Sequence, residues 1–381
     1  MNASPKTRSG GLLVLSIHVI SVLGLSALAC LGTPGNPGSI VSWGGGLPGA
    51  PASLTNITAV SAALDHTLAL RSDGTVTAWG YNFDGQCSIP SGLSQVVAVS
   101  AGAFFSVALT ADGNVVAWGD DQFNQTEVPL GATGVTAVSA GRGHVLALKA
   151  DHTVAAWGSD AYGQSDVPTG LNNVVAVFAN WNYSLALRGD GTVVAWGVDD
   201  AGQTDVPAGL SSVSALTGNM EYCLALKKDG TVVSWGNAPT VPANLSGVTA
   251  LAAGEDHCLA LKSDGTVVVW GRDDSGQLDL PANLGKVSSL GAGWNYSVAL
   301  VSGSVSSPPP PFNLTNVSWS GGTFSVSVAS QSSHNYVLQY KELLNDANWT
   351  SLAPVAGTGQ PLRLSDSNAN SGHRVYRVQE F

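Results

Sequence analysis

A Trp-Gly pair recurs seven times in this chain, and its spacing is the strongest constraint on the fold. The pairs begin at residues 43, 79, 118, 157, 196, 235 and 270, so successive spacings are 36, 39, 39, 39, 39 and 35 residues. A period of about 40 residues with several short strand-like segments per copy is typical of β-propeller blades. Val, Thr, Ser and Trp fill these segments, and 46 Gly and 18 Pro separate them. The sequence therefore predicts an all-β fold with tight turns.

Each copy contains four segments with strand character. In one copy they are 96–102 (VVAVSAG), 106–111 (SVALTA), 114–119 (NVVAWG) and 126–129 (TEVP). The small residues of the first segment suit the crowded centre of a propeller, and the Pro that ends the fourth is tolerated in an outer edge strand. Asp-Gly joins the second and third segments in most copies, which predicts a hairpin turn with positive φ. Asp151-His152 departs from this pattern, so we expect a strained or different turn there.

The two ends of the repeat region are out of phase. The first Trp-Gly, in residues 39–46, has no Leu-Ala-Leu-type segment before it, and the last such segment, in residues 293–303, has no Trp-Gly after it. Each end thus carries half a blade, and pairing the halves removes open sheet edges. We predict a seven-bladed β-propeller over residues 39–305, closed by pairing of its N- and C-terminal strands. The seventh blade would combine residues 39–53 with residues 285–305.

The first 29 residues differ from the rest. Lys6 and Arg8 precede an apolar stretch over residues 11–28, and residues 27–29 have the small-x-small form that signal peptidase accepts. This pattern predicts a secretory signal peptide over residues 1–29 and a secreted or cell-surface protein. Two alternatives stay open, an uncleaved membrane anchor and a lipidated Cys30, and they are the only routes to a membrane that we expect.

A second region begins after the repeats. Residues 306–311 (SSPPPP) indicate a stiff Pro-rich linker. Alternation of apolar and polar residues then resumes over residues 312–381, which predicts a small immunoglobulin- or fibronectin-like β-sandwich that serves as a spacer or attachment.

The charge of the chain limits its partners. Its 15 Lys and Arg stand against 26 Asp and Glu, which gives a formal net charge of −11. Binding to phosphate backbones needs a basic surface, so we do not expect nucleic acid as a partner, and anionic membrane surfaces are disfavoured for the same reason.

The pattern AG…H-x-L-A-L…DG-x-V-x-A-W-G…GQ…VP resembles the regulator-of-chromosome-condensation repeat across residues 39–303. Residues 115–129 and 137–149 are most similar to the short bacterial form found in the secreted type-two β-lactamase-inhibitor family. That resemblance implies a seven-bladed propeller that binds a target enzyme through aromatic and acidic side chains in the loops of one face. The nuclear relatives act as exchange factors and contact chromatin, but an acidic chain with a signal sequence departs from that setting.

The candidate binding face follows from chain direction. With four antiparallel strands per blade, the loops between the first and second strands share a face with the loops between the third and fourth. Exposed aromatic side chains in these loops are the usual anchors of an interface. The predicted partner-binding residues are Tyr81, Phe83, Phe104, Asp120, Asp121, Phe123, Tyr162, Trp181, Asp199, Asp200, Met220, Glu221, Asp273, Asp274 and Trp294. The same loops also carry Asp65, Asp84, Asp160, Glu255 and Asp256.

Several recurrent residues are expected to be structural. The tryptophans should wedge between neighbouring blades; they are Trp43, Trp79, Trp118, Trp157, Trp196, Trp235 and Trp270. His66, His144 and His257 occupy a position that other copies fill with Phe or Tyr, so a role for imidazole chemistry is not expected there. Cys223 and Cys258 stand where other copies carry Ser, Thr or Val, which favours a small buried residue over a disulfide.

The resulting functional hypothesis is a secreted module that binds a protein partner, of the enzyme-inhibitor type. The first alternative is a binder of carbohydrate or cell-surface polymer, and the second is a propeller lyase or hydrolase that uses the acidic loops. A unique, poised acid–base or nucleophile pair is not evident, so no catalytic residue, metal or cofactor is assigned. A simpler interpretation also stays open, in which the aromatics cap the sheets and the Asp residues form turns.

Overall fold

The computed structural model describes residues 39–45, 50–51, 54–282, 284–302, 315–320, 323–330, 332, 335–341, 350–369 and 374–380. The predicted signal peptide, Cys30 and the Pro-rich linker lie outside these residues. The chain divides into two compact units, residues 1–305 and residues 306–381. All elements in the described part are strands, and it contains no helix with the length and apolarity needed to cross a membrane.

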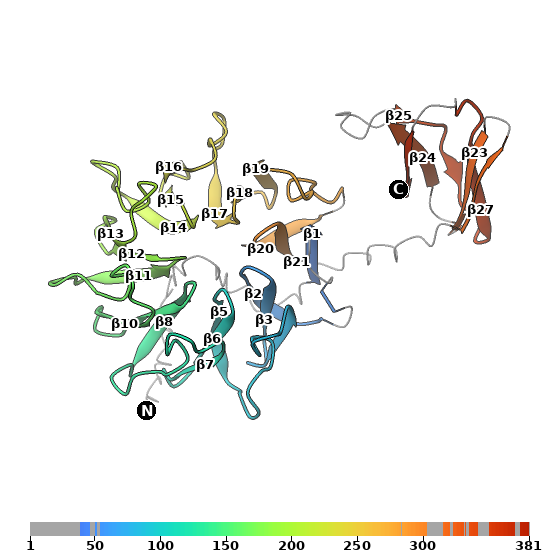
Figure 1. The fold of residues 1–381 in the computed structure, drawn as a ribbon. Coiled ribbons are helices and arrows are strands. Elements are labelled where there is room, and N and C mark those ends of the chain that lie inside the picture. The colour runs from blue at the N-terminus through green and yellow to red at the C-terminus, as the bar shows by residue number, and fades with distance from the viewer. Residues whose placement is uncertain are drawn as a thin grey trace, which may run out of the picture. The chain divides into compact units, whose positions relative to one another are not determined.

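The first unit contains six three-stranded antiparallel sheets made from consecutive strands, arranged around a common centre (Figure 1). Blade 1 holds β2 (Ile57–Ala62), β3 (His66–Arg71) and β4 (Val76–Gly80); blade 2 holds β5 (Val96–Ala101), β6 (Phe105–Thr110) and β7 (Val115–Gly119); blade 3 holds β8 (Val135–Ala140), β9 (His144–Lys149) and β10 (Val154–Gly158). Blade 4 holds β11 (Val174–Ala179), β12 (Tyr183–Arg188) and β13 (Val193–Gly197); blade 5 holds β14 (Val213–Asn219), β15 (Tyr222–Lys227) and β16 (Val232–Gly236); blade 6 holds β17 (Val248–Ala253), β18 (His257–Lys262) and β19 (Val267–Gly271).

Blade 7 combines strands from both ends of this unit. β1 (Ser39–Gly44) pairs antiparallel with β21 (Tyr296–Ser302), from Ser39 opposite Val301 to Gly44 opposite Tyr296, and β21 pairs with β20 (Lys286–Ala292). The innermost strand of each blade contacts that of the next, and β20 contacts β2. The terminal segments that were expected to share a blade therefore do so, and blade 7 lies beside blade 1.

The expectation of four strands per blade is wrong for the described residues, since each blade has three. The segment predicted as a fourth strand in blade 2, residues 126–129, forms turns instead. Backbone N–H groups of Glu127 and Val128 donate to the carbonyls of Asn124 and Thr126, at 3.3 and 3.1 Å. Pro129 has no N–H to donate. Because local turns use these backbone groups, the segment contributes no ladder to β7.

Small residues allow the innermost strands to approach one another. Ala59, Ala98 and Ala137 are buried in these strands, as are Ser61 and Ser100. The hydroxyl oxygen of Ser61 accepts the N–H of Ala101 in the next blade at 2.9 Å, and Ser100 accepts from Ala140 at 3.0 Å. A short polar side chain thus bridges adjacent sheets where a larger one would clash.

The departing turn at Asp151-His152 keeps the geometry of its counterparts. His152 has φ of 63°, in the left-handed region that Gly74 and Gly113 occupy in the equivalent turns at 77° and 80°. Such a backbone is uncommon for a residue with a Cβ. The His152 ring forms a 2.9 Å hydrogen bond between Nδ1 and the carbonyl oxygen of Val174, which offsets part of this cost.

The second unit contains two sheets. One has the order β22 (Thr315–Ser320), β23 (Thr323–Ala329), β27 (Pro361–Asp366), and in the other β24 (Asn335–Lys341) pairs with β25 (Thr350–Ser351), β26 (Val355–Ala356) and β28 (Val375–Glu380). Val326, Val328, Tyr336, Leu338 and Leu364, from both sheets, form one buried cluster. Its assignment to an immunoglobulin- or fibronectin-like fold stays a prediction.

Candidate functional site

Two sets of loops lie together on one face of the propeller. The inner loops join the first and second strands of each blade (residues 63–65, 102–104, 141–143, 180–182, 220–221, 254–256 and 293–295), and the outer loops follow the third strand (residues 81–90, 120–129, 159–168, 198–207, 237–242 and 272–281). The first residue of an outer loop donates its backbone N–H to the inner loop of its own blade, as in Tyr81 to Asp65 (2.7 Å) and Asp120 to Phe104 (3.0 Å). The expected sharing of a face by the two loop sets is therefore present without a fourth strand.

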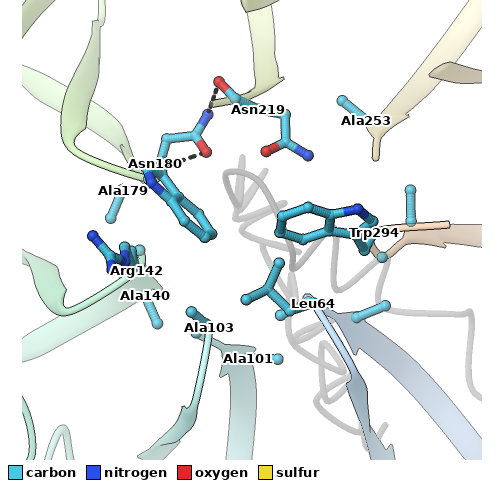
Figure 2. Close-up of a pocket in the computed structure, with 17 residues that line it drawn as sticks. Leu64, Ala101, Ala103, Ala140, Arg142, Ala179, Asn180, Asn219, Ala253 and Trp294 are labelled. Carbon is cyan, nitrogen blue, oxygen red and sulfur yellow. Dashed lines mark hydrogen bonds between the residues drawn. The ribbon is translucent and has the colours of Figure 1, made fainter. Parts of the chain in front are cut away.

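One inner-loop position, two residues before the recurrent ring, is equivalent in all seven blades, and five of its residues line the central opening: Leu64, Ala103, Arg142, Trp181 and Trp294. The seven residues, which we call the mouth, are Leu64, Ala103, Arg142, Trp181, Met220, Glu255 and Trp294. Backbone hydrogen bonds link neighbouring inner loops here, from Arg142 to Asn180 (3.2 Å), Glu255 to Trp294 (3.3 Å) and Trp294 to Leu64 (3.3 Å). Figure 2 shows Leu64, Arg142, Asn180, Asn219 and Trp294 around the opening, with alanines of the innermost strands in its wall. The repeat thus presents six kinds of side chain from one scaffold position, with Trp occurring twice.

Two tryptophans meet at the mouth. Trp181 of blade 4 and Trp294 of blade 7 pack edge to face with ring centroids 6.1 Å apart. The guanidinium of Arg142 lies 5.0 Å from the centroid of the Trp181 ring, within the range of a cation–π interaction. Both indoles are half-buried. The prediction placed both tryptophans on this face, and the structure brings them into contact.

A depression of about 600 Å³ adjoins the mouth. Its lining includes Asp65, Phe104, Trp181, Trp294 and Tyr296. Partial burial raises the pKa of the Asp65 carboxyl and, mainly for the same reason, that of Glu255, whose backbone N–H bonds to Trp294. Partly desolvated carboxylates therefore lie near the exposed surface of the tryptophan pair.

The outer loops of blades 1 to 3 carry exposed aromatic side chains. Phe83 is 84% exposed, Tyr162 55%, Tyr81 46% and Phe123 43%; we call these four the aromatic arc. Tyr81 and Phe83 stack with ring centroids 6.3 Å apart. Within the described residues of the propeller, every exposed aromatic belongs to this arc. Blades 4 and 6 carry Asp200-Ala201 and Asp274-Ser275 in the corresponding part of the outer loop, so the arc occupies one sector of the face.

The predicted acidic residues take part in bonds that shape their own loops. Asp121, Asp199 and Asp273 each accept the backbone N–H of the residue five positions later, at 2.8 to 2.9 Å. Asp120 and Asp200 accept from the side-chain amides of Gln125 and Gln203 at 2.8 Å. Glu221 accepts from Asn237, and Asp274 pairs with Arg272. The turn-forming interpretation therefore describes part of what these carboxylates do, and most of them stay exposed.

The tryptophan series lies at the seams between blades. The Nε1–H donates to a glutamine carbonyl of the preceding blade at 2.9 to 3.0 Å in five cases, which are Trp43 to Gln277, Trp118 to Gln86, Trp157 to Gln125, Trp196 to Gln164 and Trp235 to Gln203. The same glutamines are buried, and their side-chain oxygens accept an N–H of their own outer loop, as Gln125 does from Phe123 at 2.8 Å. Gly-Gln is part of the repeat pattern, but its spacing alone predicted no role for the glutamine.

The recurrent ring of the second strand pairs with a small residue one blade further on. The hydrogen-bonded pairs are His66–Ser106, His144–Ser184, His257–Ser297, Tyr183–Cys223, Tyr222–Cys258 and Tyr296–Thr67. Phe105 and Val145 occupy the equivalent positions of the remaining seam and belong to one apolar cluster. Cys223 and Cys258 are free, buried thiols, so they do not form the disulfide considered as an alternative. Polar rings thus face polar neighbours, and the one Phe is matched with Val.

The histidines of these pairs are neutral and enclosed. Ser106 donates its hydroxyl to the Gln86 carbonyl at 2.8 Å, so its lone pair accepts from Nε2–H of His66 at 3.0 Å. Nδ1 of His66, His144 and His257 is buried without a partner. Burial lowers the pKa of the three to about 4, 3 and 4. These imidazoles hold seams and do not face solvent, and the described residues form no group of three or more potential metal ligands.

Arg142 and Leu64 belong to the mouth but were absent from the predicted set. The signal that could have found them is register, because each is the residue two positions before the recurrent ring. The predicted inner-loop residues were mostly aromatic or acidic, and position in the repeat was not a criterion. A cation at this position therefore passed unnoticed.

Comparisons with known proteins agree with this architecture. The family model described as the regulator of chromosome condensation (RCC1) repeat matches residues 57–86, 96–125, 135–164, 174–203 and 248–277. No curated protein sequence matches the chain.

Similar solved structures include Prp20p of Saccharomyces cerevisiae, studied for binding to Gsp1p and histones, with a TM-score of 0.61 and 20% identity over 72% of this chain and 94% of that one. Yeast RCC1 (Prp20) in complex with Kap60 has a TM-score of 0.60 and 19% identity over 80% and 96% of the two chains. The CRINKLY ectodomain of the Arabidopsis thaliana receptor kinase ACR4 has a TM-score of 0.54 and 19% identity over 71% and 96%. At these identities the likeness concerns the fold. The described repeats therefore form an RCC1-like β-propeller with seven three-stranded blades.

Proposed function

We propose that this protein acts outside the cell as a binding module that recognises a protein partner through the mouth and the aromatic arc. The observation that carries the proposal is that the exposed aromatics of the described propeller residues are confined to three neighbouring outer loops of one face. Aromatic side chains held in solvent lose their packing energy unless a partner covers them, and Tyr and Trp are typical interface anchors. RCC1-like propellers generally serve protein interactions, as the partners of the yeast proteins, Gsp1p, histones and Kap60, illustrate.

The loop scaffold supports this proposal. In the outer loops of blades 2 and 3, Asp121 and Asp160 accept backbone N–H groups of their own loop, and Gln125 and Gln164 are buried, so these loops are shaped before any partner arrives. A preorganised surface pays less ordering entropy on binding. The aromatic arc is therefore presented on rigid loops rather than on segments that must fold on contact.

Capture of partners from the native extracellular fraction tests the proposal. The bait is the whole chain, compared with a variant carrying Tyr81→Ser, Phe83→Ser, Phe123→Ser and Tyr162→Ser. The matched control is Leu130→Ser, which removes a fully exposed apolar side chain from outside the arc. We expect a protein retained by the wild type and the control and lost from the arc variant.

Other results of the capture distinguish the alternatives. Retention by the arc variant would contradict the choice of surface, and loss of binding on addition of soluble polysaccharide would favour a carbohydrate binder. Nitrocefin hydrolysis by β-lactamases in the presence of the purified chain tests inhibition directly. The N-terminal sequence of the protein recovered from the medium tests secretion, with cleavage before Cys30 as the expected result.

A further inference from the structure

We propose that the depression beside the mouth receives a cationic side chain, a lysine or arginine of the partner, between Trp294 and Asp65. This inference rests on the proposed protein binding, and it adds the chemistry of the group that the mouth would accept. Both residues line the same depression of about 600 Å³, which is open to solvent and large enough for a side chain and its flanking backbone.

The aromatic lining favours a cation. Trp181, Trp294 and Phe104 contribute half-buried rings to the depression, and the faces of such rings attract ammonium and guanidinium groups. Arg142 already places its guanidinium 5.0 Å from the centre of Trp181. One indole of the pair thus carries an internal cation, and Trp294 lies on the far side of that pair.

The carboxylates lie on the Trp294 side of the mouth. Trp294 donates its N–H to Leu64, the neighbour of Asp65 in blade 1, and accepts the N–H of Glu255 in blade 6. Two acidic residues therefore flank Trp294 along the ring of inner loops. Burial disfavours the charged form of both carboxyls, and an added positive charge would restore it.

The balance of charge on the loop face opposes binding of an anionic group in the depression. The arginines of this face are Arg142 and Arg272, and Arg272 already pairs with Asp256 and Asp274. Arg142 also lines the depression, where its guanidinium lies over Trp181. An anionic group would meet this one arginine and would approach many carboxylates of the described loops. A cation is attracted by the same field.

The test titrates the full ¹⁵N-labelled chain with three blocked peptides that differ in one residue, acetyl-Gly-Lys-Gly-amide and its Gln and Glu analogues. Trp294→Phe and Trp181→Phe assign the indole N–H signals. We expect a saturable shift of the Trp294 indole signal with the Lys peptide and none with the Gln or Glu peptides. Asp65→Asn should weaken the binding of the Lys peptide roughly threefold. Glu127→Gln makes the same charge change at an exposed site away from the mouth and should leave binding unaltered.

Several outcomes would overturn the inference. They are equal binding of the Gln peptide, preference for the Glu peptide, an unmoved Trp294 signal, or equal affinities of the Asp65→Asn and Glu127→Gln proteins. Glu255→Gln provides a second acidic variant if Asp65→Asn fails to fold. Because no partner is needed, loss of Lys-peptide binding alone would reject this inference while leaving partner capture intact. Failure of the wild-type chain to capture any protein, or equal capture by the arc variant, would reject the proposed function instead.

Discussion

The seam between blades 4 and 5 differs from the seam between blades 5 and 6 in the length of one outer loop. At the first, the carbonyl of Gln203 accepts both Nε1–H of Trp235 and the thiol of Cys223, at 2.9 and 3.3 Å. At the second, the outer loop from Gly236 to Pro242 is four residues shorter than its counterpart and contains no Gln. Trp270 keeps its buried position, but its Nε1–H has no partner.

This difference separates two contributions that the other seams combine. The indole of Trp270 still fills the space between the blades, so packing holds the position of the ring. The hydrogen bond is therefore an addition to that packing, and a buried donor without an acceptor carries a desolvation cost. We expect the seam between blades 5 and 6 to be the weaker one.

The largest expected effect concerns seams that contain histidine. Because burial lowers the pKa of His66, His144 and His257 to about 4, 3 and 4, from 6.5, the unfolded chain binds more protons than the folded chain below pH 6.5. The free energy of unfolding should be constant above that pH and fall as the pH drops toward 4, by roughly 3 kcal/mol per histidine. Denaturant unfolding at pH 7 and pH 4.5 measures this loss.

The seams without histidine supply the control. The double change His144→Tyr with Ser184→Cys installs the ring–thiol pair that Tyr222 and Cys258 form at the weaker seam. The acid-dependent loss should shrink by about one third of its total, and an unchanged pH profile would contradict the assignment of the loss to these rings.

The next effect compares one substitution at the two seams. Trp235→Phe removes the Nε1–H that donates to the carbonyl of Gln203, so the seam loses a hydrogen bond. Trp270→Phe removes an Nε1–H that has no acceptor. Both lose similar ring volume. We expect Trp235→Phe to cost roughly 1 to 2 kcal/mol more in the free energy of unfolding. Equal costs from urea titration would mean that the glutamine carbonyl contributes nothing net.

A smaller effect on the free energy of unfolding should follow from restoring the full length of the outer loop of blade 5. Residues 237–241 can be replaced with VDDAGQTDV, the sequence of residues 198–206, which adds four residues and the Gly-Gln pair. A carbonyl placed as in the other seams would accept Nε1–H of Trp270 and stabilise the propeller by about 1 kcal/mol. The same graft with the glutamine and its preceding glycine replaced by Ser-Ser should give no gain.

The smallest effect concerns the other exception to the repeat, the turn at His152. His152→Gly relieves a positive φ but loses the bond to Val174, so the two terms nearly cancel and stability should change by about 0.5 kcal/mol or less. His152→Ala loses the bond and keeps the strained backbone, so it should be the more destabilising of the two. Thermal unfolding of both variants checks the order.

The periodic features of the fold were predictable from the sequence because each appears in many copies. The blade count, the half blades at both ends and the tight Asp-Gly turns follow from the spacing of Trp-Gly and Leu-Ala-Leu. The prediction of a fourth strand was wrong. The segment Thr126–Pro129 has strand propensity, but backbone hydrogen bonds in its local turns decide its structure. Propensity of so short a segment is easily overridden.

The site was less predictable because its residues do not repeat. Exposed aromatics such as Phe83 stand out by type, but Arg142 matters through its contact with Trp181, which only the structure shows. The pairing of His66 with Ser106 was present in the sequence as a correlation between copies one period apart. The ring position and the small-residue position recur as two separate series. Neither series alone reveals that the two residues face each other across a seam.

The pairing of β1 with β21 has a consequence for synthesis of the chain. Ser39–Gly44 leaves the ribosome about 250 residues before its partner strand Tyr296–Ser302 exists. Until then its ladder of backbone donors and acceptors stays open to any strand nearby, including those of other nascent copies. Completion of blade 7 is thus the final step in assembly of the propeller. A chain released by a ribosome that stalls before Tyr296 has two strands, β1 and β20, without their partner β21, and both can pair with strands of other chains.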